Sequence, residues 1–189
     1  MNDKNHYNYV TTYSGRKLNF KNPNPDDILL EDIVHNLSMI CRYNGATKYH
    51  YSVLQHSVVL AAYVMDKTGD AEQALSALCH DFSEAYIVDI PRPIKPHLKG
   101  YKSIENKLMK VILEKFGVKK PSSFVMQCDT NIVANEAKNL FTYTPDWIAD
   151  YDMLDIGDWE FQEADRDSVR EVFMFAYNSL KNKISETVQ

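Results

Sequence analysis

The chain has 189 residues and a formal net charge of -5 at pH 7. Hydrophobic residues make up 44% of it and charged residues 25%, which is ordinary for a globular protein and excludes a chain that is disordered throughout. The acidic balance excludes a broad basic face for duplex nucleic acid. We therefore expect no duplex partner, and any bound phosphate must be met by a few local cations or by a metal.

The cysteines and the N-terminal residues bear on the cellular compartment. Cys41, Cys79 and Cys128 form an odd set without CxxC spacing, so we expect neither a disulfide framework nor a zinc ribbon. The polar N-terminus lacks the apolar segment of a secretory signal. The longest apolar run, 58–65, is far shorter than the roughly 20 residues that a membrane span needs. These features predict a cytoplasmic protein with no membrane partner.

The predicted elements begin with a small β-hairpin over residues 7–20. Tyr7, Tyr9 and Thr11 alternate with other residues along its first strand, and Ser14-Gly15 supplies the turn. A Pro-rich breaker follows. Apolar residues at helical spacing then predict a helix over about 26–45.

The rest of the chain reads as helices separated by one proline-rich loop and one acidic segment. We expect helices over about 51–67, 70–84, 101–116, 121–141 and 165–183. Three prolines after residue 90 force an extended loop. The acidic, aromatic segment 144–167 has no clean period and predicts a solvated loop, although its Trp147, Tyr151 and Trp159 could pack against a neighbouring subunit. The fold class predicted is mostly α: a single domain over 1–189, with its core at about 26–141 and a minor N-terminal hairpin.

The His80-Asp81 pair carries the first indication of chemistry. Such a pair is common by chance, but His56 and Asp129 also lie in helical stretches that are otherwise apolar. Burying these groups without partners costs free energy, and a shared metal would satisfy all four. Two imidazoles and two carboxylates suit a divalent transition metal such as Mn, Fe, Co, Ni or Zn. Adjacent helical residues do not share a face, so His80 and Asp81 can converge only at the frayed end of a helix.

Side chains near this set could complete a site for phosphate chemistry. A metal lowers the pKa of a bound water, which can then attack phosphorus as hydroxide. Glu84 or Asp89 could orient that water or act as general acid-base. Arg42 and Lys95 are the natural phosphate cations, and Tyr43 could stack on a base. The reserve cations are Arg16 and Arg92.

Taken in order, these segments resemble the HD-domain phosphohydrolases, in particular small prophage and phage-type members that act on deoxynucleotides. The matching segments are ICRYNG at 40–45, YSVLQHS at 51–57, HDFSEAY at 80–86, DIPRPIK at 89–95 and Cys128-Asp129. The resemblance spans about residues 10–140. Each segment alone is common, whereas the ordered set is specific.

The resemblance implies a helical HD-domain bundle with a metal held by four residues. It places Glu84 and Asp89 near the attacking water, and Arg42 and Lys95 toward the phosphate of a small-molecule deoxynucleotide. It also implies a homo-oligomer, located in the host cytoplasm if the gene is phage-encoded. Only His97 lies where the dinuclear branch carries extra histidines, so no permanent second metal is expected, although magnesium could enter with a triphosphate. The implied metal ligands are His56, His80, Asp81 and Asp129.

Two activities of this family compete. A dNTP triphosphohydrolase, of the type that depletes dATP, releases a deoxynucleoside and triphosphate, whereas a 5′-deoxynucleotidase removes the phosphate of a dNMP. We favour the first because the chain resembles the phage type in length and in its Arg42-Tyr43 pair. A catalytically silent nucleotide-sensing module is the alternative from another class, but such a module need not keep acid-base groups. A cyclic-nucleotide or alarmone hydrolase is disfavoured by the missing histidines.

Overall fold

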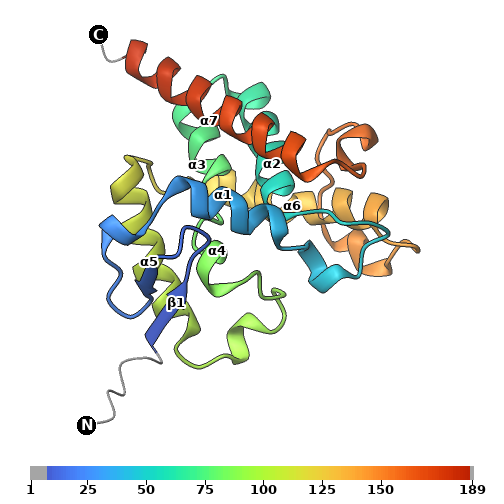
Figure 1. Cartoon of the computed structure of the whole chain (residues 1–189). Coiled ribbons are helices and arrows are strands. Elements are labelled where there is room, and N and C mark those ends of the chain that lie inside the picture. The colour runs from blue at the N-terminus through green and yellow to red at the C-terminus, as the bar shows by residue number, and fades with distance from the viewer. Residues whose placement is uncertain (1–7, 188–189) are drawn as a thin grey trace.

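The protein folds into a mostly α structure with one small hairpin. The computed structural model describes residues 8–187, so Tyr7 of the expected hairpin lies outside the described residues. Within that range there are seven α-helices and two short antiparallel strands (Figure 1). The predicted fold class is confirmed.

The hairpin and the six predicted helices follow one another in the predicted order, and the short helix α4 is an element that the sequence analysis did not predict. The strands are β1 (Tyr9–Thr11) and β2 (Lys17–Asn19), with Val10 opposite Leu18. The helices are α1 (Leu30–Met39), α2 (Val53–Thr68), α3 (Ala71–Leu78), α4 (Glu84–Ile87), α5 (Tyr101–Phe116), α6 (Ser123–Leu140) and α7 (Arg166–Thr187). Short 3-10 turns are η2 (Pro25–Asp27), η3 (Arg42–Gly45), η4 (Lys95–His97), η5 (Asp146–Asp150) and η6 (Asp158–Phe161).

The long helices pack around one core. α2 packs against α3, and α7 crosses α1, α2 and α3 (Figure 1). Leu37, Leu54, Leu60, Leu78 and Phe173 from these helices are fully buried, and one apolar cluster extends from Leu18 in β2 to Tyr177 in α7. Among residues 8–187, no helix combines the length and the apolar character that crossing a membrane requires.

Two predicted helices are shorter in the structure than in the sequence-based expectation. The helix expected over 26–45 consists of η2, α1 and η3, because residues 40–42 leave the helix to pair with the chain before α2. There Arg42 N–H donates to the Tyr51 carbonyl at 2.9 Å, and Val53 N–H donates to the Ile40 carbonyl at 3.0 Å. Tyr43 and Asn44 then take left-handed backbone conformations.

The helix expected over 70–84 ends at Leu78. Beyond it, the ring Nδ1 of His80 lies 2.7 Å from the carbonyl oxygen of Ala77, so a side chain occupies an acceptor at the helix end. Residues 79–83 form turns before α4 begins. His80 and Asp81 therefore lie at an irregular helix end, where adjacent residues can point to the same place.

The start of α3 depends on a side-chain cap. The Asp70 carboxylate accepts hydrogen bonds from the backbone N–H groups of Glu72 and Gln73 at 2.9 and 3.2 Å. We expect Asp70→Ala to lower the free energy of unfolding by about 1 kcal/mol, measured by urea denaturation. Although burial opposes it, hydrogen bonding from Gln73 and Glu72 lowers the pKa of Asp70.

That shift predicts how the cap contribution depends on pH. A carboxyl with a lowered folded-state pKa stabilises the protein above its ordinary pKa and loses that effect as pH falls. The difference between wild type and Asp70→Ala should therefore shrink on acidification below about pH 4. Asp66→Ala is the matched control because Asp66 is an exposed acid on α2. Equal stability of wild type and Asp70→Ala at neutral pH would contradict the assignment of the cap.

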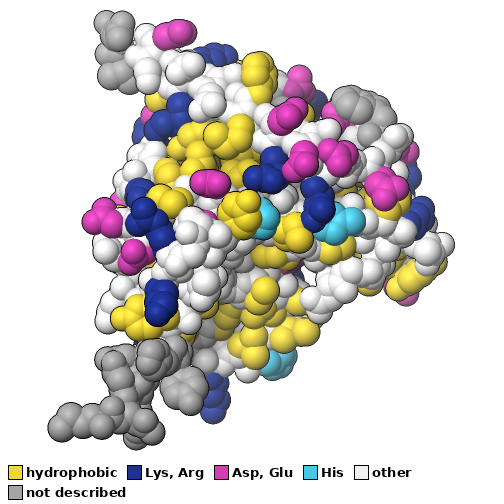
Figure 2. All heavy atoms as spheres, in the orientation of Figure 1, with side chains coloured by type: hydrophobic (Ala, Val, Ile, Leu, Met, Phe, Trp, Pro, Cys, Tyr) yellow, Lys and Arg dark blue, Asp and Glu magenta, His cyan; other side chains and the backbone are white. Residues whose placement is uncertain are grey.

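The face over α1 and α7 carries charges of both signs. Figure 2 shows lysines and arginines intermixed with acidic side chains there, around a group of hydrophobic side chains. A groove of about 540 Å³ lies between these helices, with Leu30, Val34 and Met174 among its apolar lining residues. No predicted site residue lines this groove.

Candidate metal centre

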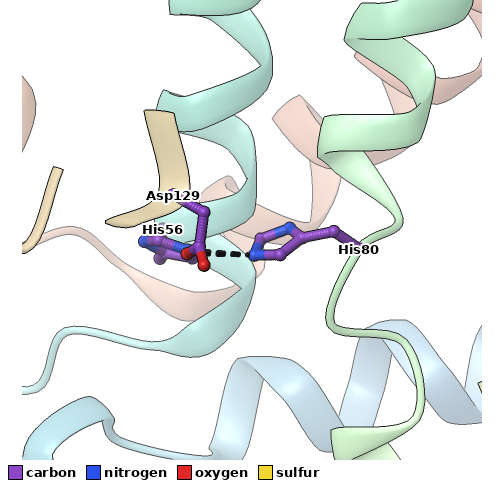
Figure 3. Close-up of side chains that lie close together, drawn as sticks. All are labelled: His56, His80 and Asp129. Carbon is purple, nitrogen blue, oxygen red and sulfur yellow. Dashed lines mark hydrogen bonds and ion pairs between the residues drawn. The ribbon is translucent and has the colours of Figure 1, made fainter. Parts of the chain in front are cut away.

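Two imidazoles and one carboxylate meet at a point between three segments of the chain. His56 comes from α2, His80 from the turn after α3, and Asp129 from α6 (Figure 3). The Nε2 atoms of both histidines lie 3.3 Å from Asp129 Oδ1, and they are 3.4 Å from each other. Three potential ligand atoms thus converge on one small volume.

These separations fit a metal ion. With metal–ligand bonds of about 2.1 Å, neighbouring donor atoms lie about 3.4 Å apart in a tetrahedral site and about 3.0 Å apart in an octahedral site. His56 is fully buried, and the side chains of His80 and Asp129 are 4% and 14% exposed. This group can therefore hold a metal ion, as the sequence predicts, although the geometry does not select one metal.

Both histidines are held with Nε2 toward the cluster. His56 Nδ1 lies 2.6 Å from Glu136 Oε1, and His80 Nδ1 lies 2.7 Å from the Ala77 carbonyl oxygen. In a neutral imidazole, an acceptor at Nδ1 favours the tautomer in which Nδ1 donates and Nε2 keeps its lone pair. Partners of this kind orient the histidine ligands in metal sites.

Asp81 lies beside the same cluster. Its Oδ2 is 3.1 Å from His80 Nε2 and 3.9 Å from His56 Nε2. Burial raises the pKa of Asp81, but the His80 imidazole outweighs burial and lowers that pKa to about 2. Burial also raises the pKa of Asp129, but the neighbouring imidazoles outweigh it and hold that pKa well below its usual range. Both carboxylates are therefore ionised at neutral pH, as metal ligands must be.

Glu136 is central to the site and is not among the predicted site residues. Its side chain is fully buried and contacts His56, Arg42 and Tyr43, the last at 2.5 Å between Tyr43 OH and Oε2. Burial opposes ionisation, yet Arg42 and His56 lower the pKa of Glu136 to about 2. Glu136 follows Asp129 by seven residues, two helical turns, and therefore shares its face. An acid at that spacing on an apolar helix face is the signal that could have identified it.

Arg42 is held by Glu136 rather than free. Its Nε and Nη2 atoms donate to Glu136 Oε2 at 3.1 and 2.8 Å, and its side chain is 10% exposed. Glu136 therefore fixes the positions of Arg42 and Tyr43. The expected roles of Arg42 at the phosphate and of Tyr43 at the base remain predictions.

One cavity of about 510 Å³ connects the predicted residues. All of them line it except His56 and His80. Pockets of this size are typical of small-molecule sites. Arg92 also lines it and donates to Asp129 Oδ2 at 3.2 Å, whereas Arg16 bonds the Asp26 carbonyl and does not line the cavity.

The expected acid-base residues share a charged corner of this cavity. Glu84 is 3% exposed; its Oε1 accepts from Lys95 Nζ at 2.9 Å, and its buried Oε2 has no protein partner within the described part of the chain. Burial, and then the carboxylates of Asp81 and Asp89, raise the pKa of Glu84 well above its usual range. Lys95 Nζ also lies 3.3 Å from Glu105 Oε1. Glu105 is not among the residues that the sequence analysis proposed for the site.

Asp89 follows a residue in an unusual backbone conformation. Val88 has φ of 63°, which is rare and costly for a β-branched residue. Its N–H donates to the Glu84 carbonyl at 2.9 Å, and its own carbonyl accepts from Tyr101 OH at 3.2 Å. These bonds hold the turn that brings Asp89 to the cavity. Burial and then Asp81 raise the pKa of Asp89, against the effect of Arg42.

The acidic segment after α6 also reaches the cavity. Trp147, Asp150 and Tyr151, from η5 and the residue that follows it, line its wall. The sequence predicts a solvated loop here, and the structure instead places its aromatic rings beside the site. The expectation for Trp159 lies outside the described side chains.

Comparison with known proteins places the chain in a family. No family model matches it. It is 39% identical over 133 residues to the uncharacterized Escherichia coli K12 protein YfdR. The aligned region covers 70% of this chain and 72% of YfdR. It is also 36% identical over 110 residues to an uncharacterized Rhodobacter capsulatus protein, covering 56% of each. With most of both chains aligned at that identity, this protein belongs to the same family as E. coli YfdR.

Proposed function

We propose that this protein is a metal-dependent phosphohydrolase that cleaves a deoxynucleotide between its α-phosphorus and its 5′ oxygen. The observation that carries the proposal is the buried His56, His80 and Asp129 cluster, which adjoins a cavity lined by both acid-base candidates and phosphate-binding cations. The choice of a deoxynucleotide as the substrate is based on the resemblance to the HD-domain phosphohydrolases.

The metal would be held by His56, His80 and Asp129, with Asp81 as a fourth ligand from the same side. When bound, a divalent ion supplies charge neutralisation for phosphate and a water that loses its proton more readily. The lowered pKa values of Asp81 and Asp129 keep both carboxylates charged, as binding of a metal ion requires.

Glu84 is suited to protonate the leaving 5′ oxygen. Burial raises its pKa well above its usual range, which favours the protonated form; Oε2 has no protein partner within residues 8–187, while Lys95 orients the other oxygen. Asp89, which lines the same cavity, is suited to position the attacking water. As water adds to phosphorus, it gives up a proton to Asp89, the bond to the 5′ oxygen breaks, and that oxygen takes the proton from Glu84.

Two substrate classes fit this chemistry. The resemblance favours a dNTP, cleaved to a deoxynucleoside and triphosphate. The charges in the cavity favour a dNMP, because Arg42, Arg92 and Lys95 each already contact a carboxylate. A triphosphate would therefore need to bring a companion magnesium ion. The 5′-deoxynucleotidase is the second candidate for this reason.

Product analysis distinguishes these activities. The purified protein is stripped with chelator, reloaded with Mn or Co, and incubated with dNMPs, dNTPs and rNTPs before chromatography. Deoxynucleoside with triphosphate establishes the dNTP triphosphohydrolase, and orthophosphate from dNMPs establishes the nucleotidase. No turnover with any metal, together with tight nucleotide binding, would replace the enzyme with a silent sensor.

Replacing Glu84 tests the assignment of the general acid. We expect Glu84→Gln to keep its metal and to lose turnover by about 10²-fold or more, since the amide cannot supply the proton. Metal content is measured by elemental analysis and rate by product release. Glu105→Gln is the matched control, because it also contacts Lys95 but is not among the residues that line the cavity. Full activity in Glu84→Gln would remove Glu84 from the mechanism.

A further inference from the structure

Aromatic rings form one wall of the cavity. Trp147 stands edge-on to Tyr151 with ring centres 5.9 Å apart, and Phe141 lies in the same way against Tyr43 at 5.0 Å and Trp147 at 6.5 Å. Tyr43, Trp147 and Tyr151 line the cavity. We call these three residues the aromatic wall. Edge-to-face contacts of this kind fix ring orientation.

The segment that carries Trp147 and Tyr151 is tied to α6, the helix that carries Asp129. The side chain of Asn135, which is 2% exposed on α6, makes two hydrogen bonds with Leu154. Its Oδ1 accepts from the Leu154 N–H at 2.9 Å, and its Nδ2 donates to the Leu154 carbonyl at 2.8 Å. Asn135 lies six residues after Asp129 on the same helix. These hydrogen bonds connect the chain just after Tyr151 to the helix of the metal cluster.

Asp150 adds a hydrogen-bond acceptor to this wall. Its exposed side chain lines the cavity, and no hydrogen bond or ion pair engages it within residues 8–187. An ionised carboxylate only accepts hydrogen bonds. Glu84 and Asp89 already supply the acid-base chemistry of the proposed function, and they line the same cavity, so that chemistry does not require Asp150.

We infer that the aromatic wall receives the nucleobase, with Trp147 as the stacking platform, and that Asp150 selects bases carrying an amino group. The inference rests on the proposed function, because it supplies the base subsite of the same cavity. Stacking on an aromatic ring is tolerant of base identity. A carboxylate accepts from the exocyclic amino groups of adenine, cytosine and guanine. In thymine, carbonyl oxygens flank the single ring N–H, and a carboxylate placed beside them is repelled. The selection is thus for amino-bearing bases over thymine.

Steady-state kinetics test the two roles separately. We expect Asp150→Asn to lower the ratio of kcat/KM for dAMP over dTMP by about 10-fold, because the amide also donates hydrogen bonds to carbonyl oxygens. We expect Trp147→Ala to raise KM about 10-fold or more for both, with a smaller change in kcat. The same ratios are measured for dATP over dTTP. Asp152→Asn is the control, an exposed acid of the same segment outside the cavity lining.

A second variant guards against loss of folding. Trp147→Phe keeps an aromatic ring against Phe141, so it should restore most of the affinity that Trp147→Ala loses. An unchanged base ratio in Asp150→Asn together with an unchanged KM in Trp147→Ala would overturn the inference. A general loss of kcat in Trp147→Ala that Trp147→Phe does not rescue would also count against stacking.

Trp147 fluorescence separates this inference from the proposed function. The chain has two tryptophans, so Trp159→Phe leaves Trp147 as the reporter, read without turnover in chelator-stripped protein. We expect dAMP to quench it at lower concentration than dTMP, and deoxyribose 5-phosphate to leave it unchanged. Quenching in a protein that hydrolyses no nucleotide would retain the base subsite and reject the phosphohydrolase. Turnover of nucleotides without base-dependent quenching would retain the enzyme and reject the base subsite.

Discussion

Replacing Asp129 with alanine is expected to remove both the bound metal and turnover. Its Oδ1 lies 3.3 Å from both histidine Nε2 atoms, so its loss takes away the anionic ligand shared by the cluster. Changes to residues that only orient ligands cost about 10–100-fold in metal affinity, and loss of this direct ligand should cost more. Metal per chain is measured by elemental analysis after gel filtration, and activity by release of product.

The control for this change lies two residues away on the same helix. Gln127 is exposed and faces away from the core, so Gln127→Ala should retain metal and rate. Asp81→Ala is expected to behave like Asp129→Ala, because Asp81 Oδ2 adjoins His80 Nε2 at 3.1 Å. Full metal content in Asp129→Ala would show that this cluster is a hydrogen-bonded core feature and would remove the basis of the proposed function.

Glu136→Ala is expected to lower the free energy of unfolding by about 3–5 kcal/mol, the range for removing one partner of a buried ion pair. The Arg42 guanidinium would lose its bidentate acceptor, and His56 Nδ1 would lose the carboxylate at 2.6 Å. Urea denaturation measures the effect. All proteins are compared with chelator present, so that altered metal binding does not contribute to the difference.

Glu136→Gln distinguishes the role of the charge from that of the hydrogen bonds. The amide keeps the volume and one acceptor oxygen, so we expect a smaller loss than in Glu136→Ala. The exposed Glu114→Ala, whose pair with Lys110 is 3.8 Å long, should change stability by less than about 1 kcal/mol. A comparably small effect for Glu136→Ala would mean that the Arg42 and His56 contacts do not stabilise the fold.

Local signals in the amino-acid sequence predict the six longer helices. Asp70, Gly69 and Ser122 lie at helix ends as their capping chemistry predicts, and the apolar spacing predicts the face that each helix buries. The helix end after Met39 depended instead on a tertiary contact, whereas the end after Leu78 involves a local contact between the His80 ring and the Ala77 carbonyl. Residues 40–42 pair with the strand-like segment before α2, and such pairing between separate segments is invisible to local periodicity.

In the candidate site, too, some residues could be predicted from the sequence and others could not. His56, His80 and Asp129 could be identified in the sequence because a polar group on an apolar helix face needs a partner to offset its burial. Only the tertiary structure showed that Glu136 holds Arg42 and orients His56, and that Trp147 lines the cavity. These contacts join residues about 80 to 100 positions apart, such as Arg42 and Glu136. Local propensity fixes which residues need partners, whereas the packing of helices decides which partners they meet.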